Sequence, residues 1–260
     1  MKVSVFSPYG ATTKESGVVS LLANYIAKRG AEVAQFQCDG GLPACGRDKL
    51  GGMVRTPFQC AQCIGEQNNL AVWSGVAHRL LSNHIVADDV KTAFEWILTV
   101  SGDQLRRLEF RGVNLWEACE TEMTARWQSI DMSSLSEPQE RDLRALFHAY
   151  IRTAVATERF YDGWKPQLAL VTALGDPVVH AHTTQLQRLG VDVAVCRYEE
   201  DGDVVVVDSP FEATQYSTPL ILEGITSMRA DPRSWGPEVT AMAHELLSFL
   251  GCAPDKVLPQ

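Results

Sequence analysis

The first 37 residues have the pattern of a strand–helix–strand unit, and this pattern limits the possible folds more than any other feature of the sequence. Residues 3–6 are apolar apart from Ser4 and precede the turn-rich segment 7–10. In residues 16–28 apolar side chains recur at helical spacing, and Gly30 follows as a C-terminal cap. Residues 31–37 then alternate as a strand. Such units build parallel sheets, so we expect an α/β fold.

The same pattern returns in the last third of the chain. Residues 168–172 form an apolar run, and Asp176, which a proline follows, has the signature of a helix N-cap. Residues 191–196 predict the next strand, and residues 201–207 predict a hairpin or a short edge strand. A last helix is expected over residues 237–250. The fold class predicted is therefore α/β, a Rossmann-like doubly wound parallel sheet.

Two segments of different character separate these α/β stretches. Residues 38–68 are rich in cysteine, glycine and proline, which predicts a cysteine-rich metal-binding loop. Residues 69–160 have mainly helical patterning and are expected to form a helical insertion. With 45 % hydrophobic and 21 % charged residues, the composition is that of a globular protein, and we expect residues 1–260 to form a single Rossmann-like domain.

Charge and hydropathy exclude several classes of function. The formal net charge is -9, which disfavours general binding to nucleic acid or to anionic membranes. No apolar run approaches the roughly 18 residues that a membrane span requires. The first residues contain no long apolar segment of a signal peptide. We therefore expect no nucleic-acid partner, no membrane span and a cytoplasmic location.

Four of the seven cysteines cluster early in the sequence. Cys38, Cys45, Cys60 and Cys63 have the spacing Cys-x6-Cys-x14-Cys-x2-Cys. In a reducing cytosol such a cluster favours a metal site over disulfides, and four thiolates suit a structural zinc ion with no open coordination position. An iron–sulfur cluster is the alternative cofactor. If the cysteines bind no metal, they are free thiols or form a disulfide. Whether Cys119 joins the cluster is left open.

Candidate ligand-contacting residues lie where strands end. Tyr9, Gly10 and Lys14 follow the first strand, at the place of a phosphate-binding Walker A loop. His180 follows the predicted cap at the next helix, and Glu199 comes just past a strand. Ligands bind at the carboxyl ends of strands in sheets of this kind. Packing or surface positions are the plain alternatives for these residues, and the catalytic residues are unknown from sequence.

Three segments resemble bacterial glycosyltransferase-like proteins of surface polysaccharide biosynthesis, which have a GT-B architecture. The matching segments are residues 6–9, residues 38–45 and residues 57–63. Residues 159–193 are similar to the strand–helix–strand that closes the N-terminal half of that group. The resemblance implies the acceptor-side half of a GT-B enzyme, which acts with a separate partner subunit or as a non-catalytic binding module. It also implies carbohydrate or nucleotide-sugar as a ligand.

A weaker resemblance links residues 7–30 to ParA/MinD-type ATPases. Thr13 stands where the Walker A pattern has glycine, and Glu15 stands where it has a hydroxyl residue. A carboxylate at that place would repel a nucleotide phosphate. This resemblance implies a degenerate P-loop regulatory protein, and a metal-stabilised protein-interaction module is a further alternative.

Overall fold

The computed structural model describes residues 1–9, 14–46, 57–127, 135–172, 175–199, 204–208, 213–217 and 237. Its strands are β1 (Lys2–Phe6), β2 (Glu32–Gln37), β3 (Ala77–Leu80), β4 (Glu109–Phe110), β5 (Val113–Asn114), β6 (Leu168–Val171), β7 (Asp192–Glu199), β8 (Val204–Asp208) and β9 (Ala213–Ser217). Its α-helices are α1 (Lys14–Lys28), α2 (Pro57–Ser74), α3 (Ala87–Leu98), α4 (Leu115–Trp127), α5 (Glu137–Trp164) and α6 (Pro177–Arg188), and two short 3-10 helices are η2 (Leu81–His84) and η3 (Gly102–Arg107).

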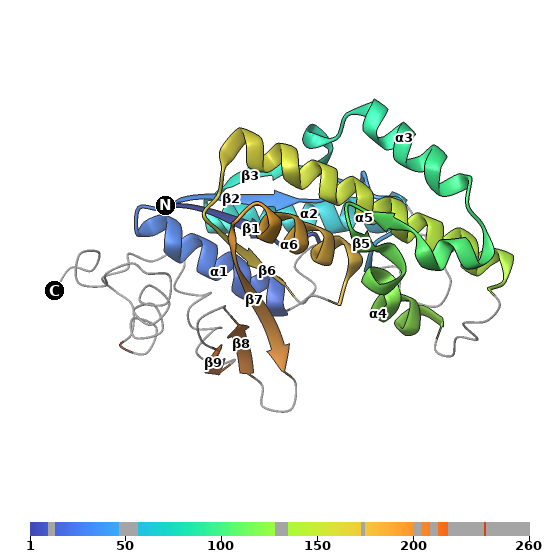
Figure 1. The fold of residues 1–260 in the computed structure, drawn as a ribbon. Helices are drawn as coiled ribbons and strands as arrows, with labels where there is room; N and C mark the ends of the chain where they lie inside the picture. The colour runs from blue at the N-terminus through green and yellow to red at the C-terminus, as the bar shows by residue number, and fades with distance from the viewer. Residues whose placement is uncertain are drawn as a thin grey trace.

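In the described part of the chain the main sheet has the strand order β3-β2-β1-β6-β7-β8-β9. The strands from β3 to β7 pair in parallel, and β8 and β9 extend the sheet antiparallel. Helices flank this sheet (Figure 1), where α1 packs with α2, and α5 packs with α6. The predicted α/β, Rossmann-like fold class is confirmed.

The hairpin predicted near residues 201–207 is confirmed as the antiparallel pair β7 and β8. Cys196 pairs with Val207, and Val195 pairs with Asp208. β8 in turn pairs with β9, so it lies inside the sheet rather than at its edge. These two strands make the sheet mixed, whereas the sequence predicted a parallel one.

Local sequence signals explain where the last helices begin. The Asp176 carboxylate accepts hydrogen bonds from the backbone N–H groups of Val178 (2.8 Å) and Val179 (3.3 Å), and Pro177 opens α6. α5 begins with a capping box, in which Ser136 and Gln139 exchange side-chain and backbone hydrogen bonds. The N-cap predicted at Asp176 is confirmed.

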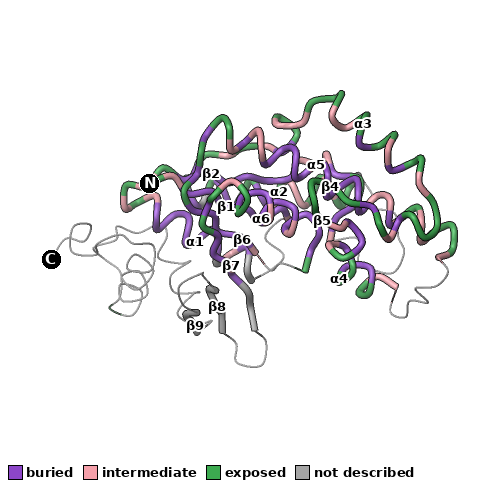
Figure 2. The backbone as a smooth tube through the Cα atoms, in the orientation of Figure 1, coloured by how far each residue is buried: buried purple, intermediate pink, exposed green. Residues whose placement is uncertain are grey.

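The hydrophobic core lies between the sheet and the pair α5–α6. The rings of Phe36 and Phe160 are stacked with centroids 4.7 Å apart, and the ring of Phe6 stacks on His182 at 4.1 Å. Figure 2 shows β1, β2 and the inner side of α5 as buried. β1 is the strand between β2 and β6, which is why its apolar run is buried along almost its whole length.

The structure differs from the sequence-based boundaries in the middle of the chain. Residues 57–68, expected to be part of a loop, belong to α2. Residues 77–80, expected within a helical insertion, form β3 of the main sheet and pair with β2. The helix expected over residues 237–250 lies outside the described residues, except for Pro237.

No helix in the described residues is both long enough and apolar enough to cross a membrane. This agrees with the sequence, which contains no long apolar run.

Candidate functional site

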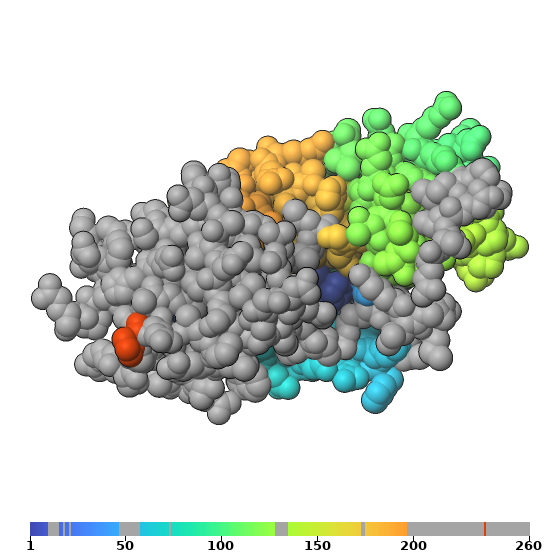
Figure 3. Space-filling view, turned by 90° about the horizontal axis from the view of Figure 1, so that it is seen from below, coloured from blue at the N-terminus to red at the C-terminus, as the bar shows by residue number. Residues whose placement is uncertain are grey.

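The topological switch point of the sheet, where the order in which the chain adds strands reverses, lies between β1 and β6. From β1 the chain builds outward to β2 and β3 on one side, and later to β6 and β7 on the other. In doubly wound sheets the crevice at the carboxyl ends of two such strands is the usual ligand-binding place. In the space-filling view the first residues of the chain, dark blue, reach the surface between α4, green, and α6, orange (Figure 3).

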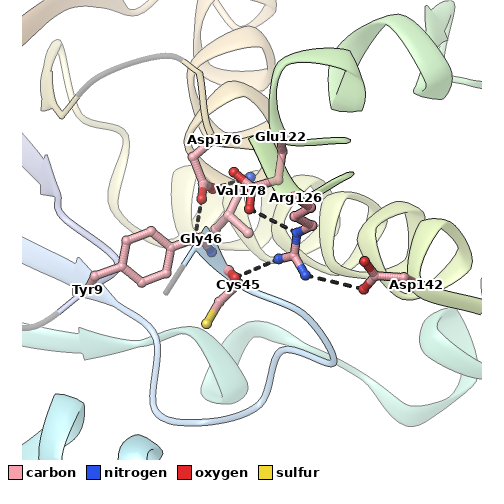
Figure 4. Close-up of polar contacts among 8 residues, drawn as sticks. All are labelled: Tyr9, Cys45, Gly46, Glu122, Arg126, Asp142, Asp176 and Val178. Carbon is pink, nitrogen blue, oxygen red and sulfur yellow. Dashed lines mark hydrogen bonds and ion pairs between the residues drawn. The ribbon is translucent and has the colours of Figure 1, made fainter. Parts of the chain in front are cut away.

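Two side chains from the two sides of this switch point contact each other. The Tyr9 hydroxyl, three residues beyond β1, donates a 2.5 Å hydrogen bond to Oδ2 of Asp176, which follows β6 (Figure 4). The backbone N–H of Gly46 donates a 2.9 Å hydrogen bond to the same hydroxyl oxygen. Gly46 comes from the segment after β2, so three loops at the carboxyl edge of the sheet meet at one phenol.

A side chain at Gly46 would disrupt this network. A Cβ atom there would collide with Oδ2 of Asp176 and would lie 3.3 Å from Cε2 of Tyr9. The close approach of this backbone to the carboxylate therefore requires glycine.

The proton affinities in the network follow from burial. Burial raises the pKa of Asp176 above its ordinary value of 3.8, and the nearby Glu122 carboxylate raises it further, against the lowering effect of the Tyr9 hydrogen bond. Burial and the Asp176 carboxylate raise the pKa of Tyr9 well above 10.0. Tyr9 therefore keeps its proton and is the donor of this hydrogen bond. The pKa of Asp176 is raised from the acidic range in the direction of neutral pH.

A buried arginine holds the segment after β2 in place. Arg126 of α4 donates from Nε to Glu122 (3.0 Å), from Nη1 to Asp142 (3.2 Å) and from Nη2 to the Cys45 carbonyl oxygen (2.8 Å). The Glu122 side chain is fully buried and that of Arg126 is 8 % exposed. One guanidinium thus connects α4, α5 and the backbone next to Gly46 (Figure 4).

Cys119 lies in α4, one turn before Glu122, and is fully buried. Burial raises the pKa of its thiol well above 9.0, and the negative charges of Asp176 and Glu122 act in the same direction. It therefore stays a protonated thiol, which is a poor nucleophile and a poor metal ligand.

Of the ligand-contacting residues predicted from sequence, Tyr9 lies at the switch point. Gly10 lies outside the described residues. Lys14 begins α1 and Glu199 ends β7, but their side chains are outside the described part. His180 lies in α6 with its ring 5.9 Å from that of Tyr150, and burial lowers its pKa. A ligand-contacting role for these residues stays a prediction.

Sequence reasoning missed the other members of the network. Asp176 was identified as an N-cap, but the bond to Tyr9 depends on which strands become neighbours. Glu122 and Arg126 are four residues apart, which is the ordinary spacing of a surface ion pair on a helix. Only the tertiary structure shows that this pair is buried.

The four clustered cysteines come from two different elements. Cys38 and Cys45 are buried in the segment after β2, whereas Cys60 and Cys63 are partly buried on α2. Among the described residues, no group of three or more His, Cys, Asp or Glu side chains is arranged to hold a metal ion. The described side chains are therefore not arranged as a metal site. Zinc or an iron–sulfur cluster stays a prediction from sequence, for elemental analysis to test.

Comparison with known proteins gives structural similarity only. No protein family model matches the chain, and no curated protein matches it. Among solved structures, AlbC, a cyclodipeptide synthase from Streptomyces noursei, is similar with a TM-score of 0.39 and 12 % identity over 70 % of this chain and 87 % of AlbC. Tyrosyl-tRNA synthetase from Archaeoglobus fulgidus, complexed with L-tyrosine, has a TM-score of 0.39 and 12 % identity over 99 % of this chain and 90 % of the synthetase.

These comparisons correct the family predicted from sequence. Neither solved structure is a GT-B glycosyltransferase or a ParA/MinD-type ATPase. The prediction of a glycosyltransferase-like protein of surface polysaccharide biosynthesis was therefore wrong, and its P-loop and metal-stabilised alternatives are not supported either. The quoted matches were short segments around turns and cysteines.

Proposed function

We propose that this chain binds a small polar ligand in the crevice between the carboxyl ends of β1 and β6, and that Asp176 exchanges a proton with it. The observation that carries this proposal is the buried Asp176 carboxylate with its raised pKa, hydrogen-bonded to Tyr9 at the switch point. A carboxyl group of this kind is suited to general acid–base chemistry, because its pKa is moved toward the working pH.

The charge around Asp176 determines the class of ligand. Glu122 and Asp176 are buried carboxyl groups, and Arg126 is the cation that bonds to Glu122. Asp142 adds a second carboxylate to the same guanidinium. Carboxyl groups therefore outnumber the cation here. A ligand with an amine or hydroxyl group fits this arrangement better than an anion, since it supplies a hydrogen-bond donor to Asp176.

Tyr9 and Arg126 have positioning roles in this proposal. Tyr9 fixes one carboxylate oxygen of Asp176 through its 2.5 Å hydrogen bond, while two backbone N–H groups of α6 fix the other. Arg126 holds the Cys45 carbonyl and so keeps Gly46 next to Tyr9. The reactive group is thus oriented by the fold before the ligand arrives.

A direct test measures proton binding at Asp176. Carboxyl carbon NMR of protein with labelled aspartate should show one resonance that titrates above the ordinary Asp range and is missing in Asp176→Asn. The matched control is Asp192→Asn, an exposed residue at the start of β7, which should keep that resonance. If every aspartate titrates in the ordinary range, the acid–base role is excluded.

Ligand binding is tested by thermal stabilisation with a panel of small amines, alcohols and carboxylates. A ligand at 100 times its Kd stabilises the native state by about 2.7 kcal/mol. We expect amines or alcohols to stabilise the protein and Asp192→Asn, but not Asp176→Asn. Stabilisation by carboxylates alone, or equal stabilisation of Asp176→Asn, would contradict the proposed site.

A further inference from the structure

A second hollow lies away from the switch point, between α3 and α5. Two neighbouring cavities of about 480 and 310 Å³ share Phe94 and His148 as lining residues, so we treat them as one groove and call it the α3–α5 groove. The two rings have centroids 5.0 Å apart. Each cavity has the size of an ordinary small-molecule site. α3 lies on α5 at the periphery of the fold (Figure 1).

One end of the groove is cationic. The larger cavity is lined by Lys91 and Arg152, and none of its described lining residues is acidic. Lys91 pairs with Glu95 at 3.8 Å, but both side chains are well exposed, so this ion pair is weak and the ammonium group can reorient. The Arg152 guanidinium donates from Nη1 to the Gly41 carbonyl oxygen, which anchors it at the cavity.

Two buried polar atoms at this end have no hydrogen-bond partner among the described residues. They are Nε2 of His148, a residue that is only 8 % exposed, and Nε of Arg152. Burying such groups unpaired is unfavourable, so a ligand oxygen that bonds to them would remove a cost already present in the empty groove. Burial and the charge of Arg152 lower the pKa of His148 to about 4, so its ring is neutral at physiological pH.

The rest of the groove combines apolar residues with a rim of two acidic and two basic side chains, which are Glu137, Glu140, Arg141 and Arg144. Arg144 pairs with Glu140 at 3.3 Å, so part of this charge is compensated. Val90 and Ile85 line the larger cavity, and Leu98 and Ala145 line the smaller one. Phe94 is 43 % exposed and Leu98 is 55 % exposed, although both are large hydrophobic residues of α3. An apolar surface of this kind that borders a cationic end is typical of a ligand groove rather than of ordinary protein surface.

From these observations we propose that the α3–α5 groove binds a small organic acid, with its carboxylate between Arg152 and Lys91 and its apolar chain or ring along Phe94 and Leu98. The carboxylate supplies the acceptor that Nε of Arg152 lacks in the described structure, and it can also accept from His148 in the tautomer protonated at Nε2. This site is separate from the proposed site at Asp176, and its ligand has the opposite charge preference.

The test is isothermal titration calorimetry of the full chain with decanoate, compared with decanol and decylamine. Decanoate should bind with a stoichiometry near one, and the uncharged and cationic compounds should bind at least tenfold more weakly. These three probes share the same apolar chain, so their order of affinity isolates the head group. Equal binding of decanol, tighter binding of decylamine, or no binding of decanoate would overturn the proposal.

Variants identify the groove as the place of binding. Lys91→Met and Phe94→Ser change exposed side chains and should fold normally, and each should weaken decanoate binding several-fold. Arg152→Met should weaken it tenfold or more, and Arg152→Lys, which keeps the charge, should recover part of the loss. The control is Lys28→Met at the exposed end of α1, which should bind decanoate as the native sequence does. Unchanged affinity in both Lys91→Met and Phe94→Ser would exclude the groove.

Discussion

Tyr9 and Asp176 lie 167 residues apart in the chain, and a 2.5 Å hydrogen bond joins their side chains. Each follows a strand in the parallel part of the sheet, and these two strands, β1 and β6, are neighbours. The bond therefore exists because of the strand order, and it marks the place where the two halves of the fold meet.

The first prediction concerns the pH dependence of stability. The pKa of Asp176 is raised above 3.8 in the native state. At pH values between the pKa of the unfolded state and that of the native state, the native state therefore binds more protons. The stabilising contribution of this proton is present at low pH and is lost as pH rises through the native pKa. Asp176→Asn keeps an N-cap side chain but cannot titrate. The free energy of unfolding of the native sequence, minus that of Asp176→Asn, should therefore fall as pH rises above about 4.

The measurement is urea unfolding at a series of pH values, with Asp192→Asn as the control. For the control this difference should not show the fall that Asp176→Asn produces. A difference for Asp176→Asn that rises with pH would mean that the native pKa is lowered rather than raised.

The second prediction concerns Gly46. Gly46→Ala should separate Tyr9 from Asp176, because the new methyl group would occupy the space of the carboxylate oxygen. We expect a loss of about 1–3 kcal/mol in the free energy of unfolding, the cost of leaving buried polar groups unpaired. Gly65→Ala is the matched control, since nothing lies within 4 Å of a Cβ there and alanine favours the helix by roughly 0.5–1 kcal/mol. Equal effects of the two substitutions would contradict the packing described around Tyr9.

The third prediction tests the buried arginine. Arg126→Met leaves the fully buried Glu122 without its guanidinium partner, and removing one member of such a pair costs about 3–5 kcal/mol. The double variant Arg126→Met with Glu122→Gln should recover a large part of this loss, because the buried charge is gone. Denaturant unfolding of both single variants and of the double variant gives the coupling energy. Strictly additive losses would show that the two side chains do not interact.

The fourth prediction concerns His182, which is fully buried and hydrogen-bonded through Nδ1 to Thr157 Oγ1 at 2.8 Å. Burial lowers its pKa from 6.5 to about 3. At pH values between about 3 and 6.5 this histidine binds a proton in the unfolded state but not in the native state. It therefore contributes stability near pH 7 that is lost as pH falls below 6.5. His182→Gln should be less stable at neutral pH, yet should lose less stability on acidification. Parallel pH profiles for the two proteins would contradict this assignment.

Local signals in the sequence predicted individual strands and helix starts, but not which elements pack against one another. The strands β1, β2, β6 and β7 and the Asp176 cap follow from apolar runs, turn residues and a proline. The start of α2 at Pro57 was missed because the glycines, prolines and cysteines of residues 38–68 were interpreted as one long loop. Whether a pair such as Glu122 and Arg126 is buried depends on packing between distant segments, which no local pattern contains.

The resemblance to a glycosyltransferase family failed for the same reason. It depended mainly on short motifs at Tyr9 and around the cysteines, and such motifs do not define a functional site. Asp176 lies within residues 159–193, which were compared only as a strand–helix–strand, so its contact with Tyr9 could not be found from that resemblance.

The position of β1 between β2 and β6 has a consequence for synthesis on the ribosome. β1 can pair with β2 as soon as residue 37 has emerged, but its other edge must wait for residue 168. At roughly 5–20 residues per second, the intervening stretch of roughly 130 residues takes about 7–26 s to make. During that interval one side of β1 has no native partner, so the nascent chain needs protection from wrong pairing for longer than most of its folding steps last.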